Sequence, residues 1–524
     1  MPANQDAFGS PTIATREILE WPYQIPGGIQ TELNLGQSPV GFAGVNNLIP
    51  FKGGLFPRPL ATPTYSFNSR PINGIADFFD VTGTRQFLVM QSDQIYKYNF
   101  TLDTFTGLGG AITDTAGNIY TWAAFANLIL FSQNVDKIWS WDGSAANVTQ
   151  ISANSPITKS LLELRGYLLA GNVDDGTRAT QKIMWCASGD PTNWTTLDSG
   201  STDLYNSFGP IQKLVKINQQ GFALQYDGLT QIIPTGSGLK PFDFVPFAAK
   251  GKGCVYANTP SAFGDVGVCY VAEDNVYLFT GSESIPIGSR PLDGNRRRGA
   301  MSTILNNLRG LGDLVYGQVI TDNYSFPYRT YWLVGNFGAF IYSFDDDCWF
   351  QQTAVEFGNS RPRTIGRFPR RVSGLNTDII GIGDNSALST QAAKLFPISL
   401  KDAGTLATVA ATSDTPSLIS NWDVLGQPNR NKNIEGVRLL FRDVGSFSMQ
   451  ISIENEKGIF TSIPNTVYTT QTIGNLYELV VRFKTSGLSF KTTITFNSVA
   501  PPATPATPWV QSLSLLYQLG SPYK

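Results

Sequence analysis

The chain has 524 residues, of which 42% are hydrophobic and 12% aromatic, so two or three hydrophobic cores are expected. Charged residues make up only 15%, against roughly a quarter in an average globular protein, and the formal net charge is −2. This balance excludes a strong overall attraction to nucleic acid or to an acidic membrane, and a surface so poor in charge suits a subunit of an assembly.

The sequence contains no histidine. This excludes Ser-His-Asp and Cys-His nucleophilic sites and zinc sites that use histidine ligands. Glycoside hydrolysis by two carboxylates is the reaction class that stays open. The glycines at 107–109 and 381–383 lack the third glycine of a dinucleotide loop, and Thr177-Arg178 stands where a Walker motif requires Lys-Ser/Thr. We therefore expect no cofactor and no enzymatic activity.

The four cysteines are far apart and form neither a CxxC pair nor a disulfide framework, so buried free thiols are predicted at Cys186, Cys254, Cys269 and Cys348. Met1–Ser10 has neither the basic nor the apolar region of a signal peptide, and no run of about 18 apolar residues occurs. Neither export nor a membrane anchor is expected.

Along the chain, residues 1–70 are rich in Gly and Pro and weakly periodic, which predicts an extended N-terminal arm that orders against neighbouring molecules. Residues 71–398 contain seven candidate hairpins, each an apolar strand, a polar turn and a second strand that in most copies is rich in aromatics. They are Gln86–Tyr98, Asn127–Trp141, Gly166–Trp185, Gly221–Ile233, Val266–Phe279, Thr330–Phe344 and Asp378–Asn385. The best helical segment is about 299–314.

The hairpins recur about every 40 to 65 residues, which is the period of propeller blades with four strands each. One small twisted sheet cannot bury its own face, whereas a closed ring of sheets can. The sequence therefore predicts an all-β fold with an irregular six- or seven-bladed β-propeller over 71–398. The alternative is a stack of unrelated hairpins in a sandwich.

Residues 399–524 differ from the propeller region because their strands alternate cleanly with period two. This pattern predicts a C-terminal antiparallel β-sandwich with one face of each sheet buried. The predicted strands are Gly436–Phe441, Phe447–Ile453, Leu476–Phe483, Phe490–Phe496 and Val510–Tyr517. The Pro-rich stretch at 500–508 predicts an exposed, semi-rigid loop before the last of them.

Several short segments resemble the tail nozzle (packaged-DNA stabilisation) proteins of short-tailed bacteriophages. Gly189–Trp194 matches a recurrent G-D-P-x-x-W turn of that family. The other similar segments are Asn46–Gly54, Tyr120–Leu130, Met184–Ser188, Gly251–Val255, Gly267–Phe279 and Ala339–Trp349.

The resemblance implies a structural virion protein that is made in the host cytoplasm and forms a homohexameric ring in the phage tail. Such a ring extends the portal–adaptor channel, retains packaged DNA and lets it pass at ejection. The implied partners are further copies of the chain, the head–tail adaptor above, tail fibre, spike or needle proteins, and double-stranded DNA in transit. The family brings no catalytic residues.

One segment concentrates arginine and is a candidate contact site. Arg361, Arg363, Arg367, Arg370 and Arg371 fall within eleven residues, between which Pro362 and Pro369 oppose regular structure. We expect a subunit or partner contact first and DNA phosphate second, because arginine suits fixed, planar ion pairing. A solvated loop is the plain alternative. The acidic run at 345–347 is a candidate mate across an interface.

A second arginine group, Arg296, Arg297 and Arg298, supports the same hypothesis. The tryptophans at the ends of predicted strands have two interpretations. They form a stacking platform for bases or sugars, or they pack inside the blades. Their regular positions favour packing. They are Trp139, Trp141, Trp185, Trp194 and Trp349.

Two other functions compete with a ring subunit. The first is a receptor-binding tail propeller that binds or cleaves glycans, for which acids and aromatics would converge on one face of the propeller. The second is a bacterial surface lectin, which the missing export signal disfavours.

Overall fold

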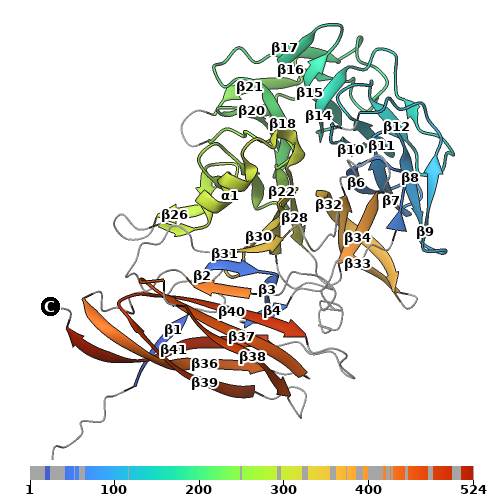
Figure 1. The fold of residues 1–524 in the computed structure, drawn as a ribbon. Coiled ribbons are helices and arrows are strands. Elements are labelled where there is room, and N and C mark those ends of the chain that lie inside the picture. The colour runs from blue at the N-terminus through green and yellow to red at the C-terminus, as the bar shows by residue number, and fades with distance from the viewer. Residues whose placement is uncertain are drawn as a thin grey trace, which may run out of the picture.

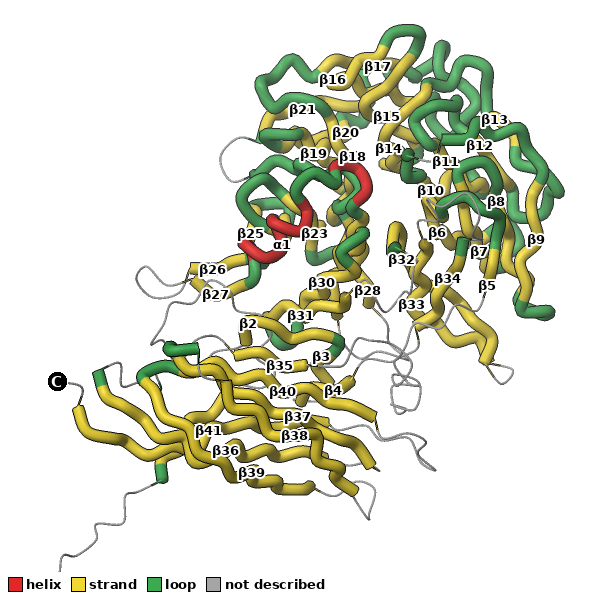
Figure 2. The backbone as a smooth tube through the Cα atoms, viewed as in Figure 1, coloured by secondary structure: helices red, strands yellow, loops and turns green. Residues whose placement is uncertain are grey.

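A computed structural model describes most of the propeller region and the strands of the sandwich. The described residues are 18–23, 42–51, 54–57, 65–115, 117–247, 251–291, 297–321, 329–353, 361–372, 375–384, 393–398, 417–420, 425, 429–442, 446–458, 460–469, 476–498 and 509–522. Strands dominate them, and α1 (Met301–Leu308) is the one α-helix among them (Figures 1 and 2). The Pro-rich stretch at 500–508 lies outside the described residues.

Six four-stranded antiparallel sheets and a seventh group of four antiparallel strands, β28 to β31 within a larger sheet, make up the propeller, so the blade count is seven. Each predicted hairpin coincides largely with the two middle strands of one blade or, in blade seven, with part of its second strand. These middle strands are β7 (Arg85–Gln91) and β8 (Ile95–Asn99); β11 (Leu128–Ser132) and β12 (Trp139–Trp141); β15 (Tyr167–Asp174) and β16 (Arg178–Trp185); β19 (Gln220–Gln225) and β20 (Leu229–Pro234); β23 (Gly267–Val271) and β24 (Val276–Phe279); β29 (Arg329–Gly335) and β30 (Gly338–Ser343); β33 (Leu375–Asp384) and β34 (Lys394–Ile398).

The first strand of every blade is the innermost and packs against the first strands of both neighbouring blades, including the first blade against the seventh, so the ring is closed. These strands are β6 (Ile72–Phe79), β10 (Thr121–Phe125), β14 (Ile157–Leu164), β18 (Ile211–Ile217), β22 (Ser261–Phe263), β28 (Tyr316–Thr321) and β32 (Pro362–Val372). The outermost strands of blades one to six are β9 (Thr104–Leu108), β13 (Thr149–Gln150), β17 (Gly200–Asp203), β21 (Phe242–Pro246), β25 (Ser284–Pro286) and β31 (Cys348–Thr353).

Blade seven takes its fourth strand from the other end of the chain. β5 (Tyr65–Ser66) pairs antiparallel with β34, with Tyr65 opposite Leu395. The two ends of the propeller region are thereby hydrogen-bonded within one sheet, which closes the ring.

The hydrophobic cores of blades one to five lie between neighbouring sheets. Ile129 and Trp139 of blade two pack with Leu88 of blade one, and Leu130 of blade two packs with Leu168 of blade three. Separate clusters fill the spaces between blades three and four, four and five, and seven and one. Each blade is therefore held by its neighbours, as expected for sheets that cannot bury a face alone.

Between blades five and six the chain makes a short hairpin, β26 (Ser289–Pro291) and β27 (Arg297–Gly299), followed by α1 and a 3-10 turn (Gly312–Leu314). The predicted helical segment is thus confirmed over its first half. Met301, Ile304 and Leu308 lie on one face of α1 at helical spacing and are buried.

The C-terminal region forms two packed antiparallel sheets, which appear below the propeller in Figure 1. One contains β3 (Leu48–Phe51), β4 (Gly54–Pro57), β41 (Trp509–Pro522), β36 (Arg430–Arg442) and β39 (Leu476–Gly487), with β1 (Leu19–Tyr23) paired to β41. The other contains β2 (Phe42–Asn46), β35 (Ser417–Ser420), β40 (Phe490–Ser498), β37 (Ser446–Asn455) and β38 (Phe460–Thr469). All five strands predicted here are present.

The second of these sheets is continuous with blade six. β2 pairs in parallel with β31, so a single nine-stranded sheet runs from β28 to β38. One hydrophobic cluster includes Trp349 of blade six together with Phe441, Phe496 and Leu515 of the sandwich. The two domains therefore share both a sheet and a core.

The expectation of an extended arm over 1–70 needs correction for the residues described. β1 to β4 are strands of the sandwich sheets and β5 is a strand of blade seven. β1, β2, β4 and β5 each pair with a strand more than 300 residues away, whereas β3 and β4 also form a hairpin with each other. Short segments rich in Gly and Pro carry no periodicity by which such pairing could be foreseen.

Candidate functional site

The arginine-rich segment is a strand, not a loop. Residues 362–372 form β32, the innermost strand of blade seven, and pair with β33 from Pro362 opposite Asp384 to Val372 opposite Leu375. Among the described strands, β32 pairs with β33 alone, so it lies at the edge of its sheet, where proline is tolerated. Because β34 pairs with β33 only at 380–383, Arg370 and Arg371 lie on a part of the hairpin that extends beyond the third strand.

The described arginine side chains of this segment differ in exposure. Arg361 and Arg367 are exposed. Arg367 donates hydrogen bonds from Nη2 to the carbonyl and hydroxyl oxygens of Thr321, which ends β28, the innermost strand of blade six. Arg363 is only 2% exposed, and burial lowers its pKa to about 10. The expectation that Arg363 makes a subunit, partner or DNA contact therefore needs correction, because its side chain is buried inside the fold.

The remaining candidate arginines are only partly described. The side chains of Arg370 and Arg371 lie outside the described part, as does all of Arg296. The backbones of Arg297 and Arg298 belong to β27, where they pair with Pro291 and Arg290. The two groups thus lie on different hairpins, one in blade seven and one between blades five and six.

The acidic run at 345–347 is engaged within blade six. Asp345 accepts from the Arg329 guanidinium at 2.6 Å, Asp346 accepts from the Ser343 hydroxyl at 2.9 Å, and Asp347 accepts from the Tyr342 hydroxyl. These contacts brace the turn between β30 and β31. The acidic run therefore stabilises this turn, whereas its pairing with arginines across an interface stays a prediction.

All five tryptophans singled out in the sequence are buried, with exposed fractions of 7% or less. Their indole N–H groups donate within the same blade or to a neighbouring segment; Trp185 donates to the Asp198 carbonyl at 3.0 Å and Trp349 to the Ile287 carbonyl at 2.8 Å. The packing interpretation is therefore confirmed. The turn at 189–194 is closed by a bond from the Trp194 indole to the Pro191 carbonyl.

The innermost strands of blades two, three and four bring a polar group together near the propeller axis. The ammonium of Lys159 on β14 donates to Gln212 Oε1 on β18 at 3.3 Å. The ammonium of Lys213 on β18 donates to the hydroxyl of Thr121 on β10, also at 3.3 Å. A side chain of blade four thus reaches a residue of blade two, which is possible only on the inner side of the ring, where these strands converge.

Lys213 is half-buried in this space, and desolvation lowers its pKa to about 8. The Cys254 thiol opposes this shift, and the charge of Lys159 adds a smaller lowering effect. Among the described residues, no carboxylate forms an ion pair with Lys213. Further along the same two strands, Lys216 and Glu163 are paired at 2.5 Å. The sequence indicated none of this, because the inner strands mix polar and apolar residues without clear alternation.

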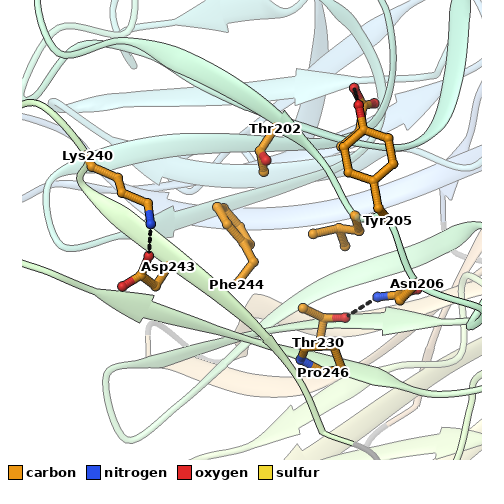
Figure 3. A pocket seen from close by; sticks show the side chains of 10 residues that line it. Thr202, Tyr205, Asn206, Thr230, Lys240, Asp243, Phe244 and Pro246 are labelled. Carbon is orange, nitrogen blue, oxygen red and sulfur yellow. Dashed lines mark hydrogen bonds and ion pairs between the residues drawn. The ribbon is translucent and has the colours of Figure 1, made fainter.

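A second candidate site is a hollow of about 320 Å³ between the outermost strands of blades three and four. Figure 3 shows the rings of Tyr205 and Phe244 on opposite walls, with the Lys240–Asp243 ion pair on the Phe244 side. Tyr205 is 93% exposed and lies near Asp203. The Asn206 side-chain amide donates to the Thr230 hydroxyl at 2.9 Å. The hollow combines an exposed aromatic ring with two carboxylates and the amide group of Asn206.

The cysteines are buried and free, as predicted. Burial raises the pKa of the Cys186 and Cys254 thiols to about 12, so neither is poised as a nucleophile at neutral pH. Within the described ranges, no three of the Asp, Glu and Cys side chains gather as metal ligands. No helix in the same ranges is long and apolar enough to cross a membrane.

No protein-family model matches this chain, and no curated protein matches it. Among solved structures, the crystal structure of BBS1N in complex with ARL6DN, soaked with mercury, is similar at a TM-score of 0.39 and 7% sequence identity. The match covers 66% of this chain and 97% of that chain. At this level the similarity says nothing about the function of this chain.

Proposed function

We propose that the chain is a structural subunit of a phage tail nozzle. In this proposal, six copies form a ring below the head–tail adaptor, retain packaged DNA and let it pass at ejection. Fibre, spike or needle proteins attach to the ring. The chain has no catalytic role.

The observation that carries the proposal is the sheet shared by the propeller and the sandwich. A subunit that retains packaged DNA needs its domains in fixed relation, and a continuous nine-stranded sheet with a common core would hold them so. The low charge content of 15% further supports a surface that is largely covered by identical neighbours. The family-like turn at 189–194, held by its own tryptophan, adds support through sequence.

The test is assembly of the purified full chain, alone and with a portal–adaptor complex from the same genome, followed by electron microscopy. A closed ring with six-fold symmetry, coaxial with the adaptor, is the expected result. A chain that stays monomeric and has no affinity for an adaptor ring would contradict the proposal.

The hollow between blades three and four favours a second candidate, a glycan-binding tail propeller. A freely exposed tyrosine beside Asp203, with Asp243 on the other side of the hollow, is the kind of surface that stacks on a sugar ring and binds its hydroxyls. Titration with fragmented host polysaccharide, using wild type and Tyr205→Ala, tests it. Saturable binding lost in the variant supports this candidate, and release of reducing sugar would point to cleavage.

A further inference from the structure

The space between blades one and two has an apolar middle and a polar end. The middle is filled by a hydrophobic cluster from β7, β11 and the residue before β10, which includes Leu88, Met90, Tyr120, Ile129 and Phe131. Successive side chains of a strand alternate between its two faces. Ser92 therefore follows Met90, and Gln133 follows Phe131, on the faces that border this space. The same two faces that form the core thus continue in polar residues.

The polar end holds buried oxygen atoms that lack a hydrogen-bond partner among the described residues. Asn73, Ser92 and Gln133 are fully buried. The unpartnered atoms are Asn73 Oδ1, Ser92 Oγ, Asp93 Oδ1, Thr115 Oγ1, Tyr120 Oη and Gln133 Oε1. An unpaired buried oxygen destabilises the fold, and six of them around one space call for an occupant. Since all six are oxygens, that occupant has to offer positive charge or donor groups.

One loop between the two blades connects these atoms. It comprises residues 113–115 and precedes β10. Asn73 Nδ2 donates to the Thr115 carbonyl at 3.3 Å, and Gln133 Nε2 donates to the Thr113 carbonyl at 2.6 Å. Each amide thus binds the loop through its nitrogen and leaves its oxygen unpaired. Because both amides are anchored to the same three residues, their oxygens border one space.

The charged groups around this loop carry an excess of negative charge. Arg70 forms ion pairs with Asp93 at 3.7 Å and with Asp114 at 2.7 Å. Asp136 is a third carboxylate, so three negative charges face one positive charge. Burial raises the pKa of Tyr120, and the charges of all three carboxylates raise it further, which places each of them near its hydroxyl. These carboxylates do not gather as a trio of metal ligands in the described ranges, so neutral oxygens have to supply most of the ligands.

We propose that this polar end of the space between blades one and two binds a calcium ion. Its protein ligands are the Asp93 carboxylate, the amide oxygens of Asn73 and Gln133, and the hydroxyls of Ser92 and Thr115. Calcium takes about six to eight oxygen ligands in flexible geometry and mixes carboxylate, amide and water oxygens, whereas zinc and copper prefer nitrogen or sulfur. The side chain of Asp93 is 34% exposed, so the ion can enter from solvent. The site goes beyond the proposed function and does not depend on it.

The experiment measures binding of radioactive calcium to the purified full chain by equilibrium dialysis, after treatment with a chelator and its removal, at constant ionic strength. Wild type is expected to bind about one calcium ion per chain with saturation. Asp93→Asn should weaken binding at least about tenfold, because it removes the charged ligand. Asp77→Asn is the matched control and should bind as wild type does. Asp77 belongs to the same blade and also pairs with an arginine, at 2.6 Å, but is not among the proposed ligands.

Thermal unfolding in calcium and in chelator separates a ligand from a residue that only supports the fold. Ser92→Ala removes a buried hydroxyl without a partner among the described residues, so in chelator its Tm should equal or exceed that of wild type. Calcium should raise the Tm of wild type with a saturating dependence and should raise that of Ser92→Ala less. Wild type without saturable binding, Asp93→Asn that binds as tightly as wild type, or an equal rise in Tm for Ser92→Ala would each overturn the proposal. Water alone would then fill the space.

Discussion

Asn47 and Gln351 are joined by a hydrogen bond of 2.9 Å from the Asn47 backbone N–H to the Gln351 backbone carbonyl. Asn47 directly follows β2, is buried and has a φ of 57°, in the left-handed region, while Gln351 lies on the outermost strand of blade six. This bond and the pairing of Asn46 with Gln351 connect the sandwich sheet to the propeller sheet. The union of the two domains thus depends on a residue type that tolerates this backbone conformation.

Asn47→Val is expected to weaken the junction. A β-branched side chain in the left-handed region costs about 1–2 kcal/mol, and the buried contacts of the asparagine are lost as well. The measurements are urea denaturation and limited proteolysis followed by mass spectrometry. We expect a lower denaturation midpoint and faster cleavage into propeller and sandwich fragments. An unchanged denaturation midpoint and an unchanged fragment pattern would argue against this role.

Tyr65 is expected to hold the ring closed. Its ring packs edge-on against Phe368 at 5.5 Å and Phe105 at 5.1 Å, and its hydroxyl donates to Asp103 at 2.5 Å. Tyr65→Ala should lower the free energy of unfolding by about 3–5 kcal/mol. Tyr65→Phe, which loses only the hydrogen bond, should cost about 1–3 kcal/mol. If both variants unfold at the wild-type urea concentration, β5 does not contribute to closure.

Replacement of buried tryptophans should destabilise the blades. Trp139→Ala and Trp185→Ala are each expected to cost about 3–5 kcal/mol, because each removes a large side chain from an inter-blade core. Tyr205→Ala removes an aromatic ring that is 93% exposed and should change stability very little. Chemical denaturation of the three variants side by side tests the contrast, which fails if Tyr205→Ala is equally destabilising.

Lys213 should make stability depend on pH. The pKa of Lys213 is about 8 in the folded state and 10.5 in the unfolded state. Below pH 8 the ammonium is charged in both states, so burying the charge destabilises the folded state to the full extent. Between about pH 8 and 10.5 the folded state releases the proton first, and stability from this group rises with pH. The charged and titratable groups facing it are Lys159 on β14 and the Cys254 thiol.

Lys213→Met removes this dependence. In phosphate-free and sulfate-free buffer, the variant should be more stable than wild type at pH 7, by up to about 3 kcal/mol, with the difference shrinking toward pH 10. Paired denaturation curves at both pH values cancel the titration of other groups. A constant difference across this range would mean that Lys213 is not desolvated.

The arginines of blade seven should separate into two classes. Joint replacement of Arg361, Arg367, Arg370 and Arg371 by Ser is expected to weaken ring or tail assembly while the thermal unfolding midpoint stays close to wild type. Arg363→Ser should instead lower that midpoint, because its side chain is buried. Wild-type assembly by the fourfold variant would contradict the proposed interface.

The sequence by itself determined the all-β class, the blade repeat and the strands of the sandwich. The middle strands of most blades, such as β19 and β23, are covered on both faces and so read as apolar runs between Asn, Asp and Gly turns. The long strands of the sandwich alternate because one face of each sheet is buried, as along β36. These patterns are local, so they are visible in a single chain.

Only the tertiary structure decided how the ring is closed and what lies at its axis. β5 has two residues and pairs with a strand more than 300 residues away, and so short a segment has no period to detect. The strand identity of 362–372 was hidden by two prolines that an edge position tolerates. Lys213 and Thr121 are 92 positions apart, and their side chains meet only because the inner strands of three blades converge, which no spacing along the chain records.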